Sequence, residues 1–555
     1  MIKNLIVKQG TQKKFALKNI DISNTTIFVG PNNSGKSLLL KEIESFLTSG
    51  PSERYLVVNS IDVPTYTEEE INSDLNSLKL PEKQDNYIRV KKPKVHGGKY
   101  EEKSIHKPGL QSYLRDPKNH ITFFLQNFYS LFTLRLDGRT RFSLTEPTSS
   151  GDLSQPAMNH LMSLFQNDEQ RKEIREIIYD AIGKYFVIDP TGMTQFKIRF
   201  SERPPENDSE EQSLELKSRE FHKQATNIAE MSDGVKAFTG IITSMFASEF
   251  KVILIDEPEA FLHPPLAKKL GLRLSQLAQK RKANLLMATH SADFVMGCIE
   301  SGTQVNIVRL TYNNGLAESK ALNHNELVSL MKDPLLRSTG VISSLFHEKV
   351  IITEADSDRS FYQEVNLRLI ESTKHGVKDC LFLNAQNKQT TARIMKPLKE
   401  LGISVATILD IDVIKEGGKN WTNLLVGAQV PVELHSSLND LRRTVKTAFD
   451  NSGYDMKRDG GISILSGGER TACLSLFSQL TQYGIFIVPF GELESWLNYL
   501  EVEKNKSTWL VNIFDKMGND PTLDTYVTPR PEEDVWKFLF IISSWFNTGK
   551  AEYNF

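Results

Sequence analysis

The pattern of apolar residues predicts a parallel α/β region in the first half of the chain. Residues 25–29 (TTIFV), 251–255 (KVILI) and 284–288 (NLLMA) are short runs without polar alternation, the pattern of strands buried on both faces. Helical spacing predicts helices over 37–46 and around 266–280. The later segments therefore form a strand–helix–strand unit, as in a parallel sheet.

The same kind of pattern restarts after about residue 345. A helix is predicted over 359–371, and the chain around it has four strand-like runs, at 349–353, 380–383, 404–409 and 484–488. We therefore predict an α/β fold with two domains, 1–340 and 345–555. Residues from about 55 to 220 are predicted to be a largely helical insertion into the first domain.

Within this insertion, helices are predicted over 120–132 and 166–186. The polar stretches at 90–99 and 203–211 are predicted to be solvated loops or hairpin tips. A basic run lies near the first of them: Lys91, Lys92, Lys94, Lys99 and Lys103. This run is either a solvated loop, which we favour, or a contact for nucleic-acid phosphates.

Composition narrows the class of protein without identifying it. With 555 residues, 39% hydrophobic and 25% charged, the chain is globular and neither disordered nor collagen-like. Its net charge of −2 gives no bulk field for nucleic acid, so such binding requires local patches. Three scattered cysteines fit a reducing cytosol, and no apolar run is long enough to span a membrane. We expect a cytoplasmic protein with no membrane contact.

A phosphate-binding loop follows the first buried strand. Residues 30–37 (GPNNSGKS) match G-x-x-x-x-G-K-[ST] between a predicted strand and a predicted helix, which is the context the motif requires. The backbone N–H groups of such a loop and the helix N-terminus bind phosphate oxygens. Lys36 supplies a charge to the β- and γ-phosphates, and the Ser37 hydroxyl suits Mg²⁺. The predicted nucleotide-binding residues of the loop are Gly30, Asn32, Asn33, Ser34, Gly35, Lys36 and Ser37.

Two acids end the strand at 251–255 and complete a site for ATP. Asp256 can hold Mg²⁺ directly or through water, and Glu257 can orient or deprotonate the attacking water.

Flanking motifs resemble those of ABC-type ATPases of the recombination-and-repair class. Residues 231–234 (MSDG) resemble the signature motif, usually Leu-Ser-Gly-Gly, and residues 259–264 (EAFLHP) follow the acids. The resemblance implies that Ser232 and Gly234 contact the γ-phosphate bound by a second protomer. It also implies that His290 senses the γ-phosphate, and that the ATPase domains form an ATP-sandwiched homodimer or a higher homo-oligomer.

A better spelling of the signature occurs at 465–469 (LSGGE), but in the wrong place. The ATPase architecture needs the signature helix shortly before the strand that ends in Asp256. We therefore assign the signature to Ser232 and predict a turn at 465–469.

A second group of acids is spaced along the C-terminal domain. Glu354 ends one predicted strand, Asp358 follows it, and Asp410 and Asp412 form an Asp-x-Asp pair at the end of another. Residues i and i+2 of a strand point the same way, and parallel strands place their carboxyl ends at one edge. Clustered carboxylates need cations between them, so Mg²⁺ or Mn²⁺ is predicted here. Two such metals can activate water and stabilise the leaving oxygen in phosphodiester cleavage.

This set resembles the Toprim domain of topoisomerases, primases and certain nucleases. The resemblance implies one more acid after the strand at 484–488, and we favour Glu494 over Glu492 as the metal ligand. A lysine near the C-terminus is expected to neutralise the scissile phosphate. Lys537 is our candidate, with a packing role as the alternative.

An ABC-type ATPase followed by a Toprim domain resembles the OLD (overcoming lysogenization defect) family. The resemblance covers nearly the whole chain and departs from the family at Asp233 and Ala355, where a glycine is usual. It implies an ATP-regulated, metal-dependent DNA endonuclease in anti-phage defence, similar to Gabija-type and retron-associated effectors. An accessory defence protein or a retron-type nucleic acid is then an expected partner.

Two other functions compete with this interpretation. One is an ATP-gated DNA clamp or sensor whose Toprim fold has no nuclease activity; the intact acids argue against it. The other is topoisomerase or primase chemistry, which would need a nucleophilic tyrosine in a separate domain or a zinc module.

Overall fold

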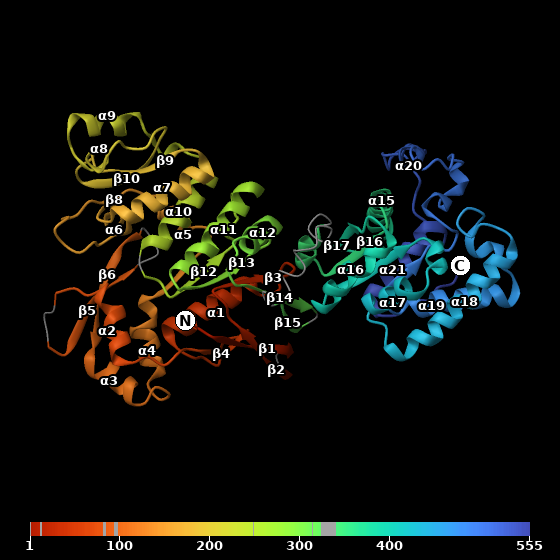
Figure 1. Ribbon diagram of the computed structural model, residues 1–555, viewed down its shortest axis with the longest axis horizontal. Coiled ribbons are helices and arrows are strands. Elements are labelled where there is room, and N and C mark those ends of the chain that lie inside the picture. The colour runs from red at the N-terminus through yellow and green to blue at the C-terminus, as the bar shows by residue number, and fades with distance from the viewer. Residues whose placement is uncertain are drawn as a thin grey trace. The chain divides into compact units, whose positions relative to one another are not determined.

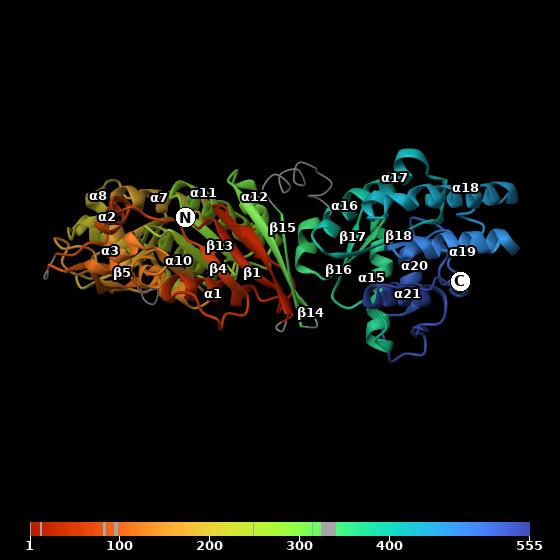
Figure 2. The same cartoon turned by 90° about the horizontal axis from the view of Figure 1, so that it is seen from below.

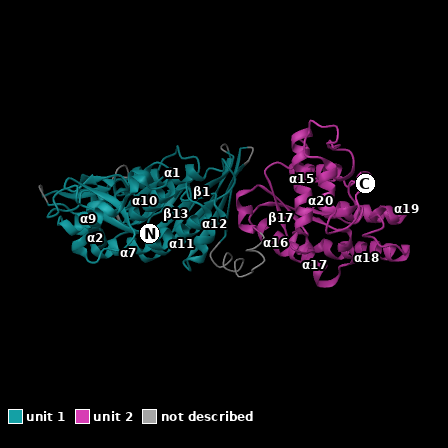
Figure 3. Ribbon diagram, turned by 90° about the horizontal axis from the view of Figure 1, so that it is seen from above, with its two compact units in different colours: residues 1–329 teal, residues 330–555 magenta. Residues whose placement is uncertain are grey.

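The computed structural model describes residues 2–11, 14–81, 85–93, 98–247, 249–313, 315–322 and 340–555. The chain divides into two compact units, Met1–Ser329 and Leu330–Phe555 (Figure 3). Lys94 of the basic run lies outside the described residues, as does most of the chain just before the predicted domain border.

A mixed sheet forms the centre of the first unit. Among the described residues, nine strands have the order β2–β1–β15–β14–β3–β13–β12–β7, with β4 beside β1. β3, β7, β12, β13 and β14 pair in parallel, whereas β1 pairs antiparallel with β2, β4 and β15. Figure 2 shows the β14–β15 hairpin beside β1. The strands are β1 (Asn4–Thr11), β2 (Lys14–Asp21), β3 (Thr25–Val29), β4 (Val58–Asp62), β7 (Thr133–Leu136), β12 (Val252–Asp256), β13 (Asn284–Ala288), β14 (Val305–Asn313) and β15 (Leu316–Leu322).

The predicted strands of this unit are confirmed, and helices cover them. β3 and β13 are buried at every position, which requires packing on both faces of the sheet because side chains alternate. α1 (Lys36–Ser49) packs against β7, β12 and β13, and its Leu40 and Ile43 share a core with Leu254 and Leu286. α11 (Pro264–Lys280) packs against β3, β13 and α12 (Ala292–Glu300).

The region between residues 55 and 220 is not one continuous insertion. β7 lies within it but pairs with β12 in the central sheet, so the chain leaves that sheet twice. The first excursion is the β5–β6 hairpin with α2 to α4, and the second is a small sheet of β8 to β11 with α6 to α9 (Figure 1). Their bounds are α2 (Glu68–Asn76), β5 (Tyr87–Pro93), β6 (Tyr100–His106), α3 (Lys107–Arg115), α4 (Ile121–Asn127), η2 (Tyr129–Leu131), α5 (Thr140–Ser143), β8 (Thr148–Ser149), α6 (His160–Phe165), α7 (Asp168–Ile182), β9 (Tyr185–Asp189), β10 (Gln195–Ser201), α8 (Asp208–Gln212), α9 (Leu216–Gln224), β11 (Thr226–Asn227), η3 (Ile228–Glu230) and α10 (Asp233–Ala247).

Three local predictions in this region were wrong in extent. The helix predicted over 120–132 is divided, because α4 ends at Asn127 and the separate 3₁₀ helix η2 covers Tyr129–Leu131. The helix predicted over 166–186 ends at Ile182, because Gly183 adopts a left-handed φ of 77° and β9 begins two residues later. The loop predicted over 203–211 contains α8, which begins because the Asn207 side chain accepts a hydrogen bond from the backbone N–H of Glu210.

The second unit is built on a parallel sheet of the order β17–β16–β18–β19. The four strands lie where the apolar runs predicted them: β16 (Lys349–Thr353), β17 (Cys380–Asn384), β18 (Ser404–Leu409) and β19 (Ile485–Ile487). Because all four are parallel, their carboxyl ends share one edge of the sheet. Glu354 follows β16 and Asp410 follows β18 at this edge.

A long helical segment separates β18 from β19. α18 and α19 lie side by side in it (Figures 1 and 2). The turn predicted at 465–469 is wrong, because Ser466 takes the N-cap position and α19 begins at Gly467. The helices of this unit are η4 (Val341–Phe346), α15 (Asp356–Thr373), α16 (Lys388–Glu400), η5 (Ile411–Lys415), α17 (Gly418–Gly427), η6 (Val432–Leu434), α18 (His435–Ser452), η7 (Gly461–Ile464), α19 (Gly467–Thr481), η8 (Leu493–Ser495), η9 (Asn498–Leu500), α20 (Trp509–Met517) and α21 (Asp534–Thr548). No helix in the described parts of the chain is long and apolar enough to cross a membrane.

Candidate functional site

The first candidate site is the loop between β3 and α1. Gly30 has a φ of 141°, and a Cβ atom there would lie 2.0 Å from the carbonyl oxygen of Leu310, so only glycine fits. Gly35, at the N-cap of α1, has a φ of 90°. Asn32 and Asn33 are exposed on the loop, and Ser34 is buried. The loop thus holds its backbone in a conformation that places several N–H groups near the start of a helix.

The Lys36 side chain lies inside this loop and is hydrogen-bonded to it. Its Nζ atom donates hydrogen bonds to the carbonyl oxygens of Gly30 at 2.9 Å and Pro31 at 2.8 Å, and to the hydroxyl of Ser34 at 3.2 Å. Burial lowers the pKa of Lys36 to about 8, although three nearby carboxylates oppose the shift. A phosphate group would supply the negative charge that this buried ammonium lacks.

The acids that follow β12 face this loop. The Ser37 hydroxyl donates to the Asp256 carboxylate at 3.0 Å, which brings together the two predicted Mg²⁺ ligands. Glu257 is exposed with a left-handed φ of 49°. His290, which follows β13, has its pKa lowered by burial and by Lys36, whereas Glu257 and Asp256 oppose the shift. Lys36, Asp256, Glu257 and His290, which come from separate motifs, therefore lie close enough to influence one another electrostatically.

Two further side chains support this group, and neither was assigned a role from the sequence, although Glu259 lies in the segment 259–264 that follows the acids. Glu259 accepts a hydrogen bond from the backbone N–H of His290 at 2.8 Å, which ties the segment after β12 to the segment after β13. Arg141 is fully buried and donates to the carbonyl oxygens of Asp256 at 2.8 Å and Pro258 at 3.4 Å. Arg141 carries no sequence motif of its own.

The signature-like residues lie at the start of α10. The Ser232 hydroxyl accepts a long hydrogen bond, 3.5 Å, from the backbone N–H of Val235. Gly234 packs so closely on residues 259–264 that a Cβ atom would lie 2.8 Å from the carbonyl oxygen of Phe261. Among the described residues, no hydrogen bond or ion pair joins Ser232 to the phosphate loop of its own chain.

A cavity of about 530 Å³ adjoins the phosphate loop. Its wall includes Ser34 and Gly35 of the loop, the aromatic residues Phe15 and Tyr55, and Tyr312 from β14. An aromatic and partly apolar wall next to a phosphate-binding loop suits the base and ribose of a nucleotide.

The second candidate site lies at the carboxyl edge of the parallel sheet. Carboxylate oxygens of Glu354, Asp410 and Asp412 lie within 4.8 Å of one another. The prediction that Asp410 and Asp412 both sit on a strand is wrong, because β18 ends at Leu409 and the 3₁₀ helix η5 begins at Ile411. The turn still directs both carboxylates to Glu354, whose side chain accepts from the backbone N–H of Asp410 at 2.9 Å.

Burial and mutual repulsion define the chemistry of this acidic cluster. Burial, with Asp410 next, raises the pKa of Glu354 to about 8. Burial, Asp410 and Glu494 raise the pKa of Asp358 to about 7. Oδ1 of Asp412 is buried and has no hydrogen-bond partner within the described parts of the chain. This oxygen could coordinate a divalent cation, which would reduce the repulsion between the carboxylates. These residues therefore fit Mg²⁺ or Mn²⁺.

Lysines that sequence reasoning missed accompany the acids. Lys457 lies 2.6 Å from Asp410 and 3.8 Å from both Asp412 and Glu492, whereas Lys388 donates to Asp412 at 3.0 Å. Lys506 lies 3.3 Å from Glu492.

Two glycines let Lys457 reach the cluster. A Cβ atom on Gly491, where φ is 118°, would lie 2.1 Å from the carbonyl oxygen of Lys457. The same approach holds between Gly461 and the carbonyl oxygen of Pro489. These glycines, at positive φ, are the sequence signal that could have drawn attention to the segment.

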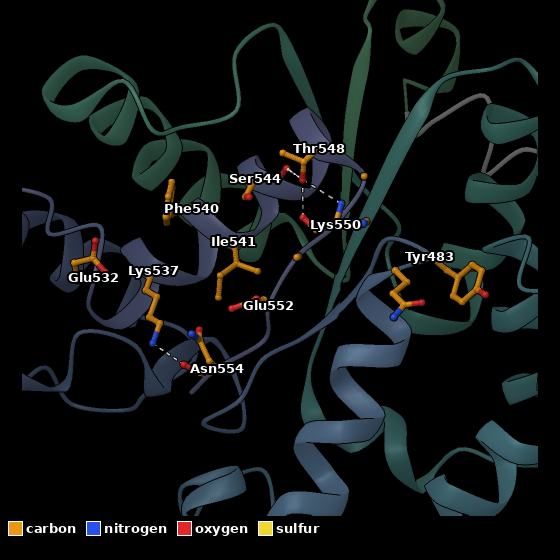
Figure 4. A pocket seen from close by; sticks show the side chains of 13 residues that line it. Tyr483, Glu532, Lys537, Phe540, Ile541, Ser544, Thr548, Lys550, Glu552 and Asn554 are labelled. Carbon is orange, nitrogen blue, oxygen red and sulfur yellow. Dashed lines mark hydrogen bonds between the residues drawn. The ribbon is translucent and has the colours of Figure 1, made fainter.

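Of the other residues predicted for this site, Glu492 and Glu494 lie near the acidic cluster and Lys537 lies elsewhere. Glu492 and Glu494 are both buried, the first immediately before η8 and the second within it. Glu494 helps to raise the pKa of Asp358, and Glu492 pairs with Lys457 and Lys506. Lys537 on α21 donates to the carbonyl oxygen of Asn554 at 2.5 Å and lies over the ring of Phe555 (Figure 4). It lines a separate cavity of about 870 Å³ near the end of the chain. The structure therefore puts Lys457, in place of Lys537, beside the carboxylates.

A family model matches one segment in each of the two units of the chain. Residues 25–297 match the family described as "AAA domain, putative AbiEii toxin, Type IV TA system". Residues 345–412 match the family described as "Overcoming lysogenization defect protein-like, TOPRIM domain". The protein is thus an ATPase followed by a TOPRIM domain, and the two together indicate an ATP-dependent nuclease. This domain order is that of an OLD-family ATPase–Toprim protein, which confirms the resemblance found in the sequence.

Solved structures similar to this chain include SMC and ABC ATPase domains. One is an SMC head bound to the C-terminal winged-helix domain of ScpA, at 14% identity, covering 59% of this chain and 99% of that one, with a TM-score of 0.33. Another is the SMC head domain of Thermotoga maritima, at 12% identity, 58% and 99% coverage, and a TM-score of 0.30. A third is MJ1267, an ATP-binding cassette of an ABC transporter, at 14% identity, 60% and 97% coverage, and a TM-score of 0.26. The comparison with curated proteins gave no match.

Proposed function

We propose that this protein is an ATP-regulated, divalent-metal-dependent DNA endonuclease that acts in anti-phage defence. The observation that carries the proposal is the convergence of Glu354, Asp410 and Asp412 at one edge of a Toprim sheet, on a chain that also has a phosphate-binding loop. Nothing in ATP binding requires this second acidic cluster, so a separate phosphodiester chemistry accounts for it best.

In the proposed nuclease site, the acidic residues would coordinate metal ions, and Lys457 would neutralise negative charge on the phosphate. Glu354, Asp410 and Asp412 provide carboxylate oxygens within reach of one cation, and Asp358 and Glu494 extend the set to a second. Metal ions held by these carboxylates would supply an activated water and would stabilise the leaving oxygen. Lys457, already within 2.6 Å of Asp410, is placed to neutralise the phosphate that approaches the cluster.

In the ATPase site, the phosphate loop and the acids divide the work. The loop N–H groups and Lys36 bind the phosphates, Ser37 and Asp256 hold Mg²⁺, and Glu257 orients the attacking water. Ser232 and Gly234 lie at the start of α10, and in the described parts of the chain they make no hydrogen bond or ion pair to their own phosphate loop, as expected if they complete the site of a second copy. ATP would then control the association of two copies and, through it, DNA cleavage.

Cleavage of plasmid and single-stranded DNA with Mg²⁺ or Mn²⁺, with and without ATP, tests the proposal. Asp358→Ala should abolish cleavage, whereas Asp356→Ala, two residues away, should leave it intact because that side chain is 67% exposed and pairs with Arg359. Lys36→Ala in the same assay shows whether ATP activates or inhibits. Cleavage that survives both Asp358→Ala and Glu354→Ala would refute the nuclease. DNA binding without cleavage under any condition would favour the ATP-gated clamp.

The defence role is tested in cells. Wild-type protein, expressed with its neighbouring gene products, should reduce phage plaque formation, and Glu354→Ala should not. Equal protection by both proteins would separate defence from nuclease activity.

A further inference from the structure

A series of ion pairs leads from the acidic cluster to the surface of the second unit. Lys457 lies 2.6 Å from Asp410 in the cluster and 3.8 Å from Oε2 of Glu492. The Nζ atom of Lys506 lies 3.3 Å from the same oxygen of Glu492. The Lys457 side chain is 22% exposed and the Lys506 side chain 68%, so the outer end of the series is open to solvent.

Glu492 is the common partner of the two lysines. Its side chain is only 11% exposed, and a carboxylate with so little contact with water needs cationic partners. Its position is fixed from the backbone, because Gly491 before it packs directly on the carbonyl oxygen of Lys457. Glu492 is not one of the three carboxylates that lie within 4.8 Å of one another in the described parts of the chain. Its contacts therefore assign it to Lys457 and Lys506 and not to a metal ion.

The segment that carries Lys506 is anchored, although it is exposed. The Asn505 side chain accepts hydrogen bonds from the backbone N–H of Ser507 at 3.1 Å and from its hydroxyl at 2.8 Å. The Asn505 carbonyl oxygen accepts from the backbone N–H of Trp509 at 2.8 Å, and the buried Trp509 ring packs against Phe361. Because this turn is ordered in advance, Lys506 loses less conformational entropy when it binds a ligand.

The spacing of the two lysines fits the backbone of a DNA strand. Their Nζ atoms lie 3.8 Å and 3.3 Å from one oxygen, so they cannot be farther apart than these two distances together. Each strand of DNA carries one phosphate charge per about 3.4 Å of helix axis, so ammonium groups this close can contact neighbouring phosphates. Lys457 lies beside the carboxylates that would receive the scissile phosphate, which leaves the exposed Lys506 for the next phosphate of the strand.

We propose that Lys506 binds the phosphate next to the one that is cut, and that Glu492 holds Lys506 and Lys457 at the spacing of neighbouring phosphates. The inference rests on the nuclease function proposed above and names the part of the substrate that this side of the site contacts. Lys506 is a binding residue, and Glu492 is a positioning residue that acts through the two lysines. Because the contact is to the sugar–phosphate backbone, it is independent of base sequence.

Lys506→Ala tests the phosphate contact, and Lys504→Ala is the matched control. Lys504 is exposed two residues away on the same segment and forms no ion pair within the described part of the chain. Affinity for a duplex oligonucleotide is measured by fluorescence anisotropy over a range of salt concentrations, with Ca²⁺ in place of Mg²⁺. Lys506→Ala should weaken binding about three- to tenfold and reduce the slope of log K against log salt by about 0.9, the value for one phosphate contact. Lys504→Ala should change neither quantity, and Lys506→Arg should restore both because it keeps the charge.

Neutral methylphosphonate linkages identify the phosphate that Lys506 contacts. The cut position is mapped in Mg²⁺, and single-turnover cleavage is then measured with one phosphate at a time replaced around it. Replacement next to the cut bond should raise the protein concentration for half-maximal rate about three- to tenfold in wild type, without a further rise in Lys506→Ala. The maximal rate of Lys506→Ala should stay close to that of wild type, because the contact is made before the bond breaks and throughout the reaction.

Glu492→Gln tests the positioning role in the same assay. This variant keeps the volume of the side chain and removes the charge that holds Lys506. The penalty for the methylphosphonate next to the cut bond should become smaller than in wild type. A role in stability alone would lower the free energy of unfolding and leave that penalty unchanged, which would overturn the assignment of Glu492.

The outcomes separate this inference from the nuclease proposal. If wild type binds and cuts DNA but Lys506→Ala has the salt slope of wild type, the inference is overturned and the nuclease stands. A methylphosphonate penalty that persists in Lys506→Ala would also overturn it, because another side chain would then hold that phosphate. If wild type binds DNA without cutting it under any condition, the nuclease proposal fails and the assignment of a neighbour to the cut phosphate falls with it. A loss of slope and of penalty confined to Lys506→Ala, in a protein that cuts DNA, supports the inference.

Discussion

Binding of Mn²⁺ to the acidic cluster is predicted to release protons from the protein. Glu354 has a pKa of about 8 and Asp358 a pKa of about 7, both raised first by burial and then by neighbouring carboxylates. At pH 7 the first group is about 90% protonated and the second about 50%, so these two carboxyls hold about 1.4 protons. Burial also raises the pKa of Asp410, so the metal-free cluster as a whole holds at least that many. Because carboxylates must be deprotonated to bind metal, saturation with Mn²⁺ should release about that number.

The number of protons released on Mn²⁺ binding should also depend on pH. At pH 8 the same two groups hold only about 0.6 protons, so the release should fall by more than half. Isothermal calorimetry in two buffers with different ionisation enthalpies measures the proton count directly. Glu354→Gln should lower the release at pH 7 to about 0.5 protons or less, and Asp356→Asn should not change it. A release near zero at pH 7 with clear Mn²⁺ binding would refute the assignment of raised pKa values to this cluster.

The same shifts set the sign of the stability change with pH. The folded state holds more protons than the unfolded state between about pH 5 and 8, because both carboxyl pKa values are raised on folding. The free energy of unfolding of the metal-free protein should therefore fall as pH rises, with the cluster contributing about 2 kcal/mol per pH unit near pH 7. Saturating Mn²⁺ should remove this contribution, and a slope of the opposite sign in denaturant titrations would contradict the argument.

Three further substitutions test other parts of the structure. Lys36→Ala should weaken ATP binding about 10- to 100-fold in a fluorescent-nucleotide titration, whereas Lys41→Ala, exposed on the same helix, should not; equal affinity in both variants would remove Lys36 from the site. Gly491→Ala should cost more than about 2 kcal/mol in urea unfolding, because the new Cβ atom would clash with the backbone; Gly453→Ala, at a φ of 76° with no atom within 4 Å, should cost only about 1 kcal/mol. Glu211→Ala leaves Arg171 and Arg175 buried without their shared partner, which should cost about 3–5 kcal/mol; a loss below about 1 kcal/mol would mean that water reaches the guanidinium groups.

Local signals explain why the strands and the phosphate loop could be predicted from the sequence. β3, β12, β13 and the four strands of the second unit are continuous apolar runs, and such runs depend little on distant residues. The loop at 30–37 combines a motif with its required strand and helix, so a single short segment carried all the information. The Toprim acids lie immediately after predicted strands, and the parallel sheet then brings them to one edge.

The features that were missed depend on contacts between distant segments. β7 joins the central sheet through pairing with β12, more than a hundred residues later, and no local pattern distinguishes it from the surrounding helices. In the sequence, Arg141 resembles an ordinary surface arginine. Its role follows from its hydrogen bonds to the carbonyl oxygens of Asp256 and Pro258, which are distant in sequence. Lys457 carries no motif, and its place beside Asp410 follows from the close approach of two loops that glycines allow.

The helical segment between β18 and β19 therefore belongs to the nuclease site. Arg442 on α18 donates to the carbonyl oxygen of Ile414 at 2.8 Å and lies over the ring of Trp421, so one side chain fixes both η5 and α17. The same segment supplies Lys457, which pairs with Asp410. Lys388, which pairs with Asp412, comes from before β18 instead. Asp412 is thus held between Lys388 and Lys457 from two different parts of the chain, and its Oδ1, which has no hydrogen-bond partner among the described residues, would be free to bind a metal ion. A change that loosens α18 should consequently lower metal affinity, although α18 supplies none of the carboxylates of the cluster itself.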